Sequence, residues 1–373
     1  MFFKDIIGQE AIKDRLRLSV QQNQIAHAQL FAGNQGHGKF ALALAYARYI
    51  QCTNRNADDA CGRCPSCVKY NKLAHPDLHF VFPVVKRSTH SISADFLTEW
   101  RQFLEDKNYF SLHDWIKLIG KENQQGGIFV DEADEIVRKM HIKSYESEYR
   151  LMLIWLPEKM NEQTANKILK IIEEPFDNTV FLLISNEPDL LLATILSRTQ
   201  RIQVPPVDEQ QLAQALTNHY YLNPADSQRI AHLSSGNVLR ALENIAVNEE
   251  KTLMLEYFKQ MMRLAYGRKL KEMKKWSEEV AALGRERQKN FLQYAQHMIR
   301  ENFIYNLQNP QLVYMNNEEE AFSSRFAPFV NERNTPQIME ELTLAEVHIT
   351  QNVNAKMVFF DLALKFIMLL KQP

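Results

Sequence analysis

The sequence has little net charge and no excess of either sign. Its 373 residues include 44 Lys and Arg against 45 Asp and Glu, which gives a formal net charge of −1. A protein that grips DNA by itself usually carries a basic domain or stripe, so we expect any contact with nucleic acid to be made within a larger assembly. With 11 Gly, 13 Pro and 45% hydrophobic residues, the composition also excludes collagen-like and largely disordered chains.

Long apolar runs are missing as well. Lys4, Asp5 and Glu10 interrupt any apolar stretch at the beginning, so no signal peptide is expected. The most apolar segment, KMVFFDLALKFIMLLKQP, is broken by Asp361 and Lys365 well short of the roughly 18 residues that a membrane-spanning helix needs. We therefore expect a soluble, cytoplasmic protein, and the length suggests two or three domains.

Cysteine is scarce, and all four cysteines fall within one short stretch. Their spacing is C-x8-C-x2-C-x2-C, at Cys52, Cys61, Cys64 and Cys67. Secreted proteins more often spread cysteines across the fold as disulfides, so this clustering suggests a metal site in a reducing compartment. Four thiolates at this spacing can surround one tetrahedral centre, which favours a closed structural Zn²⁺ site, with His75 not needed as a ligand. Unpaired thiols or local disulfides are the alternative.

The segment GNQGHGKF departs by one residue from the phosphate-binding motif G-x-x-x-x-G-K-[ST]. Gly33, Gly38 and Lys39 are in place, and Phe40 stands where Ser or Thr would ligate Mg²⁺. HAQLFAG before the loop is typical of a strand, and FALALAYARYI after it is typical of a helix. We expect that phosphate binding through Gly36, Gly38 and Lys39 could survive, whereas Mg²⁺-assisted hydrolysis should be severely impaired.

Hydrolysis in proteins of this type needs a second acidic element beside the loop. RLMLIW is the best strand for that place, but it continues into WLPE, without a carboxylate at the first two positions. A rival is GIFVDEADE, in which Asp131 and Glu132 follow three apolar residues. The residues after them have helical spacing, so we interpret Asp131 as the N-cap of a helix. The chain therefore has the pattern of an ATPase that has lost hydrolysis.

Strands and helices alternate through the first part of the chain. RLMLIW, NTVFLLISN and RTQRIQVPP are typical of strands, and NEQTANKILKIIEEP is typical of a helix that Pro175 ends. This alternation indicates a parallel sheet with helices on both faces. The stretch between the cysteines and about residue 125 shows little regular spacing of its apolar residues, so it predicts neither helices nor strands clearly. We expect an α/β domain at 1–206, a small helical domain at 207–250 and a larger helical domain at 251–373.

Several of these segments occur together, in the same order, in one known family. FKDIIGQEAIKDRL, HAQLFAGNQGHGK, the four-cysteine insertion, TANKILKIIEEP, NEPDLLLATILSRTQ and LSSGNVLRAL resemble the δ′ family of bacterial DNA polymerase III clamp-loader subunits, which are AAA+ proteins. The resemblance covers residues 1 to about 245. It implies a P-loop AAA+ α/β domain that carries the zinc module, followed by an all-helical lid and an all-helical collar for oligomerisation.

The resemblance also implies roles for single residues. Arg198 matches the arginine finger of the family's Ser-Arg-Cys motif, which acts in trans on ATP held by a neighbouring motor subunit, although Thr199 replaces the usual Cys. Asn186 matches the first sensor position and Arg240 the second. These two sensors would complete a vestigial nucleotide site with the loop residues Gly33, Gly36, Gly38 and Lys39. By itself, an arginine in a loop is more often an ordinary surface residue.

The function implied is that of a non-hydrolysing end member, or stator, of a pentameric ring. Such a chain joins γ/τ and δ subunits, and the ring loads the sliding clamp onto primer-template DNA in replication. Zn²⁺ would be a structural cofactor, ATP binding is doubtful, and no Mg²⁺ is expected. Two alternatives stay open. An active γ/τ-like motor using Asp131 and Glu132 requires ATPase activity, and a stand-alone zinc-containing DNA-binding protein requires salt-sensitive DNA binding by the isolated chain.

Overall fold

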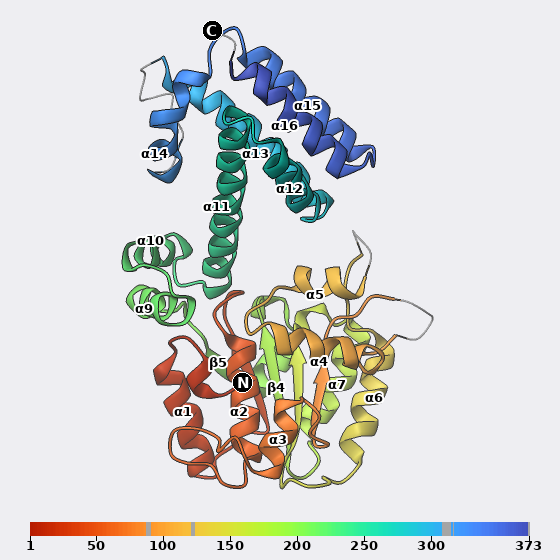
Figure 1. The fold of residues 1–373 in the computed structure, drawn as a ribbon. Helices are drawn as coiled ribbons and strands as arrows, with labels where there is room; N and C mark the ends of the chain where they lie inside the picture. Colours follow the sequence, from red (N-terminus) through yellow and green to blue (C-terminus); the bar gives the residue numbers. More distant parts are fainter. Residues whose placement is uncertain (87–90, 121–123, 308–314, 316, 372–373) are drawn as a thin grey trace. The chain divides into compact units, whose positions relative to one another are not determined.

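The structure is a computed structural model that describes residues 1–86, 91–120, 124–307, 315 and 317–371 (Figure 1). The chain forms two compact units, Met1–Asn244 and Ile245–Pro373, and each is described by itself. Among the described residues, no helix has the length and apolar character required to cross a membrane.

A five-stranded sheet with the order β2-β3-β4-β1-β5 lies at the centre of the first unit. All neighbouring strands are parallel. The strands are β1 (Ala28–Ala32), β2 (Leu78–Val81), β3 (Arg150–Trp155), β4 (Thr179–Ser185) and β5 (Gln200–Gln203). β1, β3 and β4 are buried at every position, as expected for parallel strands covered on both faces. The predicted parallel sheet is confirmed.

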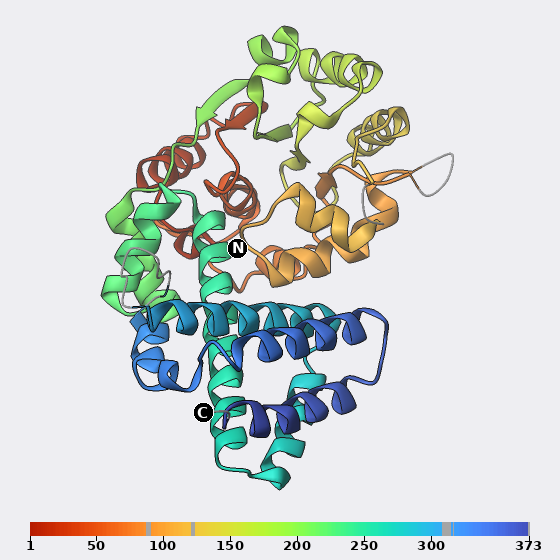
Figure 2. The same ribbon diagram turned by 90° about the horizontal axis from the view of Figure 1, so that it is seen from above.

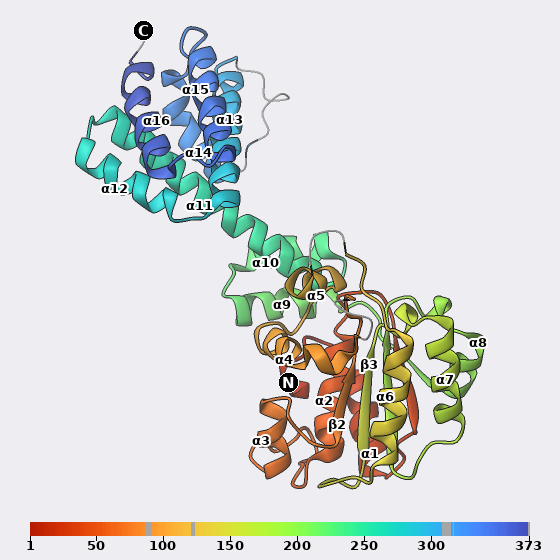
Figure 3. The ribbon, with the colours of Figure 1, turned by 90° about the vertical axis from the view of Figure 1, so that its right-hand side faces the viewer.

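Helices cover both faces of this sheet. They are α1 (Glu10–Gln21), α2 (Lys39–Gln51), α3 (Pro65–Asn71), α4 (Leu97–Asp106), α5 (Leu112–Ile119), α6 (Val130–His141), α7 (Glu162–Glu173) and α8 (Ala193–Arg198). One core joins α1 to α5 with one face of the strands, and a second core joins α6 to α8 with the other face. Figure 3 shows α2 and α3 on one side of the sheet and α6 and α7 on the other.

The stretch before residue 125, in which the sequence showed few clean periods, contains β2, α4 and α5. β2 is four residues long and, among the described residues, pairs only with β3, so it leaves little pattern in the sequence. Aromatic packing holds the two helices in place: the rings of Trp100 in α4 and Trp115 in α5 lie with their centroids 4.2 and 5.2 Å from that of Phe82. Both tryptophans are fully buried.

The residues that follow GIFV form a helix, as predicted, but the N-cap was assigned wrongly. α6 begins at Val130, with Phe129 as its N-cap, so Asp131 and Glu132 lie in the first turn. Carboxylates are favourable there because the N-terminal end of a helix carries a partial positive charge. Glu132 is buried and accepts a hydrogen bond from the Ser93 backbone N–H at 2.6 Å.

Only helices follow β5 among the described residues. α9 (Glu209–Tyr220) and α10 (Pro224–Ser234) pack on each other, and α11 (Val238–Tyr266) begins just after Gly236. The N-caps Asp208 and Asn223 accept hydrogen bonds from first-turn N–H groups of α9 and α10, which fixes where each helix begins. The domain boundaries at residues 206 and 250 stay predictions.

The described residues of the second unit form helices and the connections between them. Besides most of α11, from Ile245 onward, it contains α12 (Leu270–Ala281), α13 (Arg285–Tyr305), α14 (Asn317–Phe326), α15 (Thr335–Thr350) and α16 (Ala355–Leu369). α13 lies along α15, and α12 along α16 (Figures 2 and 3). The rings of Trp276, Phe291 and Phe359 form the centre of its core. α16 is therefore apolar because it is packed inside a helical bundle.

Candidate functional site

The glycine loop connects β1, which lies inside the sheet, to the N-terminus of α2. Gly36 and Gly38 have φ angles of 83° and 84°, which residues with a side chain rarely adopt. Gly38 is also the N-cap of α2, so the first N–H groups of this helix, which have no partner within the helix itself, lie at the end of the loop. A helix N-terminus of this kind favours anions. The backbone therefore has the form that a phosphate-binding loop requires.

Lys39 is buried against the loop. Its ammonium group donates a hydrogen bond to the carbonyl oxygen of Asn34 at 2.6 Å. Burial lowers the pKa of Lys39 to about 8, although the negative charge of Glu158 acts in the opposite direction. Because this pKa is still above neutrality, the loop keeps its cation at pH 7. Glu158 also accepts hydrogen bonds from the N–H groups of Asn186 and Glu187, at 2.8 and 3.2 Å.

Phe40 belongs to an aromatic cluster in the core. Its ring centroid lies 5.2 Å from that of Phe110, 5.6 Å from that of Trp100 and 6.4 Å from that of Trp155, each in an edge-to-face arrangement. Trp155, the last residue of β3, and Leu156 stand at the two positions where the acidic pair of a hydrolysing protein is expected from the sequence. Phe40, Trp155 and Leu156 offer no oxygen ligand for Mg²⁺, and the rings of Phe40 and Trp155 pack together.

The segment between α4 and α5 fills the space over the loop. The cavity that remains there has a volume of about 30 Å³, whereas ligand pockets usually measure roughly 300–1,000 Å³. The Tyr109 hydroxyl accepts a hydrogen bond from the Ile7 N–H at 3.0 Å, which fixes the ring in place. A Cβ atom on Gly38 would lie 3.3 Å from that ring. A nucleotide therefore has no room in this conformation.

The start of α11 covers the loop from another direction. The side-chain amide of Asn237 donates to the carbonyl oxygen of Gln35 at 3.0 Å, and the Val238 N–H donates to that of Gly36 at 3.1 Å. A Cβ atom on Gly36 would lie only 1.9 Å from Asn237 Oδ1. Glycine at position 36 thus allows α11 to approach closely.

The structure brings some of the proposed nucleotide-site residues together and leaves others apart. Asn186 directly follows β4 and borders the remaining cavity over the loop. Three of the loop residues, Gly36, Gly38 and Lys39, border the same cavity. Arg240 is exposed on α11 and does not line that cavity. Tyr109, Asn237 and Glu158 were missed in the sequence, because no motif marks them.

Arg198 is the last residue of α8 and is partly exposed. Its guanidinium group pairs with Glu173 Oε1, at the end of α7, at 2.8 Å, and it also donates to the Thr194 carbonyl oxygen at 3.0 Å. Exposed pairs contribute about 0–1 kcal/mol, so the guanidinium could leave Glu173 at little cost. Thr199, which replaces the family's Cys, donates its hydroxyl to the Ile195 carbonyl oxygen at 3.1 Å.

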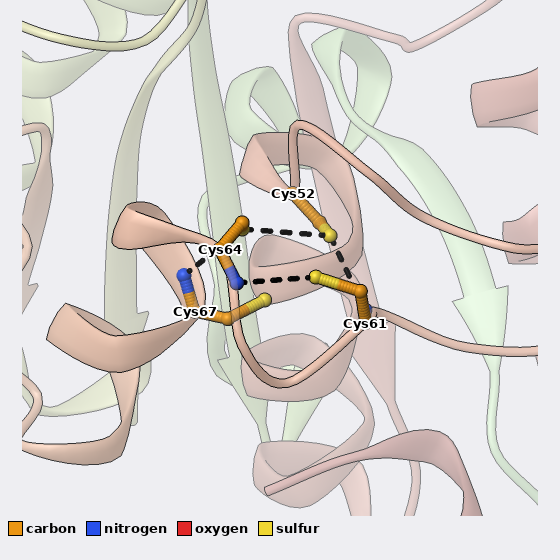
Figure 4. Close-up of side chains that lie close together, drawn as sticks. All are labelled: Cys52, Cys61, Cys64 and Cys67. Atoms are coloured by element: carbon orange, nitrogen blue, oxygen red, sulfur yellow. Dashed lines mark hydrogen bonds between the residues drawn. The ribbon is translucent and has the colours of Figure 1, made fainter.

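The four cysteines form one cluster, and their sulfur atoms all lie within 4.8 Å of one another (Figure 4). Cys52 is the C-cap of α2 and Cys64 the N-cap of α3, so two helix ends bring distant thiols together. The sulfur atoms of Cys52 and Cys64 are 3.9 Å apart. Four sulfurs placed tetrahedrally around Zn²⁺ at its usual bond length would be about 3.8 Å apart. The donor set and its spacing fit a tetrahedral metal ion.

Backbone N–H groups point at these sulfur atoms. The N–H groups of Cys61, Cys64 and Cys67 donate to the sulfurs of Cys52, Cys61 and Cys64, at 3.3, 3.3 and 3.4 Å. Burial raises the pKa of Cys64, but hydrogen bonds from the Cys67 N–H and from Thr53 outweigh it and lower that pKa to about 6. Hydrogen bonds of this kind favour the thiolate that a metal binds.

His75 lies outside the cysteine cluster. Its Nε2 atom is 3.2 Å from the Ser147 hydroxyl, and its Nδ1 atom accepts a hydrogen bond from the Asp77 N–H at 3.2 Å. The group of potential metal ligands that includes the cysteines contains no histidine among the described residues.

A sequence model of the family described as DNA polymerase III, delta subunit, matches residues 8–208, just over half of the chain. The chain belongs to this family. The DNA polymerase III subunits delta′ of Bacillus subtilis and Pseudomonas aeruginosa are 26% and 29% identical to it over 235 and 247 residues. The DNA polymerase III subunit tau/gamma of Haemophilus influenzae is 24% identical over 216 residues.

The aligned regions cover only part of each chain. They span 62%, 64% and 58% of this chain, and 57%, 62% and 25% of the Bacillus, Pseudomonas and Haemophilus proteins. The chain thus matches about three fifths of each delta′ relative and a quarter of the tau/gamma relative.

Solved structures resemble the chain less closely. A DNA polymerase III gamma subunit-related protein from Thermotoga maritima has a TM-score of 0.37 at 14% identity, covering 95% of this chain and 99% of that one. The RuvB Holliday junction branch migration motor of the same organism has a TM-score of 0.40 at 14% identity, covering 69% and 66%. Both TM-scores are below 0.5, so these structures do not define the fold of this chain. The strand order of its sheet defines the fold, and the match to the sequence model defines the family.

Proposed function

We propose that this chain is a clamp-loader subunit of the δ′ type that does not hydrolyse ATP. The observation that carries this proposal is the small cavity over the glycine loop, about 30 Å³ in volume and bordered by Tyr109 and Phe110. Asn237 also holds the loop through its hydrogen bond to the Gln35 carbonyl oxygen. Phe40, Trp155 and Leu156 add a second obstacle, because Mg²⁺ requires oxygen ligands and none of these side chains has an oxygen atom. Opening the loop would therefore not be enough to restore hydrolysis.

An active motor would need Asp131 and Glu132 beside the loop. Both lie in the first turn of α6, and neither borders the cavity over the loop. Burial raises the pKa of Glu132, whose carboxylate is engaged by the Ser93 N–H. These contacts favour the non-hydrolysing function over the motor.

In the function that we propose, the chain acts on ATP bound by a neighbouring subunit. Arg198 lies at a helix end, partly exposed, and its partner Glu173 is also partly exposed. A guanidinium placed at a neighbour's γ-phosphate would stabilise the negative charge that develops during phosphoryl transfer. Glu173 would hold the guanidinium until that neighbour is present.

The partners that we propose are γ/τ and δ subunits in a hetero-pentamer that loads a sliding clamp onto primer-template DNA. Support comes from the family match and from delta′ and tau/gamma relatives of DNA polymerase III. The helices of Ile245–Pro373 would form the collar through which subunits join. The net charge of −1 fits a chain that reaches DNA only within such a complex.

We also propose that the cysteine cluster holds a structural Zn²⁺ ion through Cys52, Cys61, Cys64 and Cys67. Four thiolates close the coordination sphere and leave no position for substrate. The metal would tie the end of α2 to the start of α3.

Measurement of ATP binding and turnover by the isolated chain, each compared with the Lys39→Ala variant, tests this function. A fluorescent ATP analogue reports binding, and phosphate release reports turnover. We expect no turnover above that of the variant, and no saturable binding that depends on Lys39. Lysine-dependent turnover at the rate of a working ATPase would contradict the proposal and favour the motor.

A further inference from the structure

The second unit contains a groove that the proposed function does not use. Its volume is about 560 Å³, within the usual range of ligand pockets. It is bordered by α11, by α14 and the 3₁₀ turn η6 (Ala327–Phe329) that follows it, and by the end of α16. All the residues that line it belong to the part of the chain that the structure describes.

The floor of the groove is a row of aromatic rings. Phe322 stacks on Phe326 with their ring centroids 5.0 Å apart, and Phe326 stacks on Phe329 at 6.3 Å. Phe329 then meets Tyr266 edge-to-face at 5.2 Å. Phe326 is buried, but Phe329 and Tyr266 are 36% and 59% exposed. Two adjoining rings thus present apolar surface that a large apolar side chain of a partner could cover.

The rim of the groove is basic. Arg263 of α11 and Arg325 of α14 are both exposed, and neither guanidinium has a hydrogen-bond or ion-pair partner among the described residues. Lys259 is already paired with Glu256 at 2.8 Å. Glu318 is the one acidic residue among those that line the groove. The two unpaired guanidinium groups therefore remain available for carboxylates of another molecule.

We propose that this groove binds a short acidic peptide segment of another protein. One large apolar side chain of that segment would cover Tyr266 and Phe329, and its carboxylates would pair with Arg263 and Arg325. Guanidinium and carboxylate groups match in shape and can form two parallel hydrogen bonds. An apolar anchor surrounded by charged pairs is a common arrangement at protein interfaces. This binding does not involve the glycine loop.

Single-stranded nucleic acid matches the groove less well. Bases bind such proteins by stacking on open ring faces, whereas Phe322 and Phe326 stack on each other and Phe326 is buried. A nucleic-acid backbone also needs a line of cations along its phosphates, but the groove offers two unpaired guanidinium groups and carries Glu318 beside them.

Fluorescence anisotropy with the full chain tests this inference. The probe is a fluorescein-labelled peptide with four aspartates around a phenylalanine–leucine pair, at low salt. We expect saturable binding that weakens about tenfold or more in the double variant Arg263→Glu, Arg325→Glu, because both charge pairs are lost. Arg300→Glu, at an exposed arginine of α13 outside the groove, should leave binding unchanged.

Substitutions in the peptide and in the aromatic floor of the groove test the same inference independently of the arginine variants. Replacing the four aspartates by asparagine, or the phenylalanine–leucine pair by alanine, should weaken binding to the parent chain. Tyr266→Ala, which removes an exposed ring without opening the core, should weaken it as well.

Three results would overturn the inference. The first is no binding of the probe to the parent chain, or binding that the double arginine variant leaves intact. The second is tighter binding of an oligothymidylate than of the acidic peptide. The third is a dimer of this chain in sedimentation experiments that Tyr266→Ala dissociates, since a second copy would then occupy the groove.

Discussion

Phe40→Ser would make the loop sequence match the phosphate-binding motif. We nevertheless expect this substitution to destabilise the first unit and to produce no ATPase activity. Phe40 is 7% exposed and packs edge-to-face on Phe110, Trp100 and Trp155. Truncating a buried Phe to Ala typically costs about 3–5 kcal/mol, through lost apolar burial and the cavity left behind. A serine hydroxyl without a partner adds a further cost. We therefore expect the free energy of unfolding to fall by about 3–5 kcal/mol.

Urea unfolding followed by tryptophan fluorescence measures this change in the relevant unit. Three of the four tryptophans, Trp100, Trp115 and Trp155, belong to the core of the first unit, so the signal reports mainly on that unit. The midpoint of the transition should fall while its steepness stays the same, because the surface exposed on unfolding hardly changes.

Tyr145→Ala is the matched control, since it removes an aromatic ring of the same unit that is 81% exposed. We expect this control to stay within about 0.5 kcal/mol of the parent chain. A loss below about 1 kcal/mol for Phe40→Ser would show that the ring is not part of a packed core. ATP turnover that appears in this variant and depends on Lys39 would refute the reasoning about Mg²⁺.

Metal analysis of the purified chain should find about one Zn²⁺ per chain, and Cys61→Ser should lower both the zinc content and the melting temperature; freely titratable thiols without zinc would contradict the metal site. Tyr109→Ala removes the ring that closes the loop, so binding of a fluorescent ATP analogue should increase while turnover stays absent; unchanged binding would mean that the ring is not the obstacle. Burial lowers the pKa of His79 from 6.5 to about 4, so the unfolded chain binds more protons than the folded one in this range. Stability in urea should therefore fall as the pH drops from 6.5 towards 4, and His79→Gln should flatten that dependence; an equal slope in the variant would exclude His79 as the cause.

Features whose signal lies within a few neighbouring residues were predictable from the sequence. β1, the glycine loop and α2 follow one another directly, and β3 and β4 are short apolar runs. The cysteine cluster was predictable for the same reason, because its closely spaced ligands need only one loop and two helix ends to meet.

Contacts between segments distant in the sequence were not predictable. Tyr109 closes the glycine loop from the connection between α4 and α5, and its position depends on the hydrogen bond from Ile7 and on aromatic packing. Asn237 reaches Gln35 only because α11 folds back onto the loop. The role proposed for Arg198 rests on a resemblance alone. Its pairing with Glu173 joins the ends of two helices that no local pattern connects.

The claim that this chain acts on a neighbour's ATP is tested most directly by Arg198→Ala in a reconstituted clamp loader. The control is Arg201→Ala, at an exposed arginine of the adjoining strand β5. Both variants should assemble and keep their zinc. Arg198→Ala should slow DNA-stimulated ATP hydrolysis at the adjoining site, where an arginine finger contributes roughly 10³–10⁵ in rate in known systems, and should slow clamp loading. Unchanged hydrolysis and loading in a fully assembled ring would contradict the account and leave Arg198 as an ordinary surface partner of Glu173.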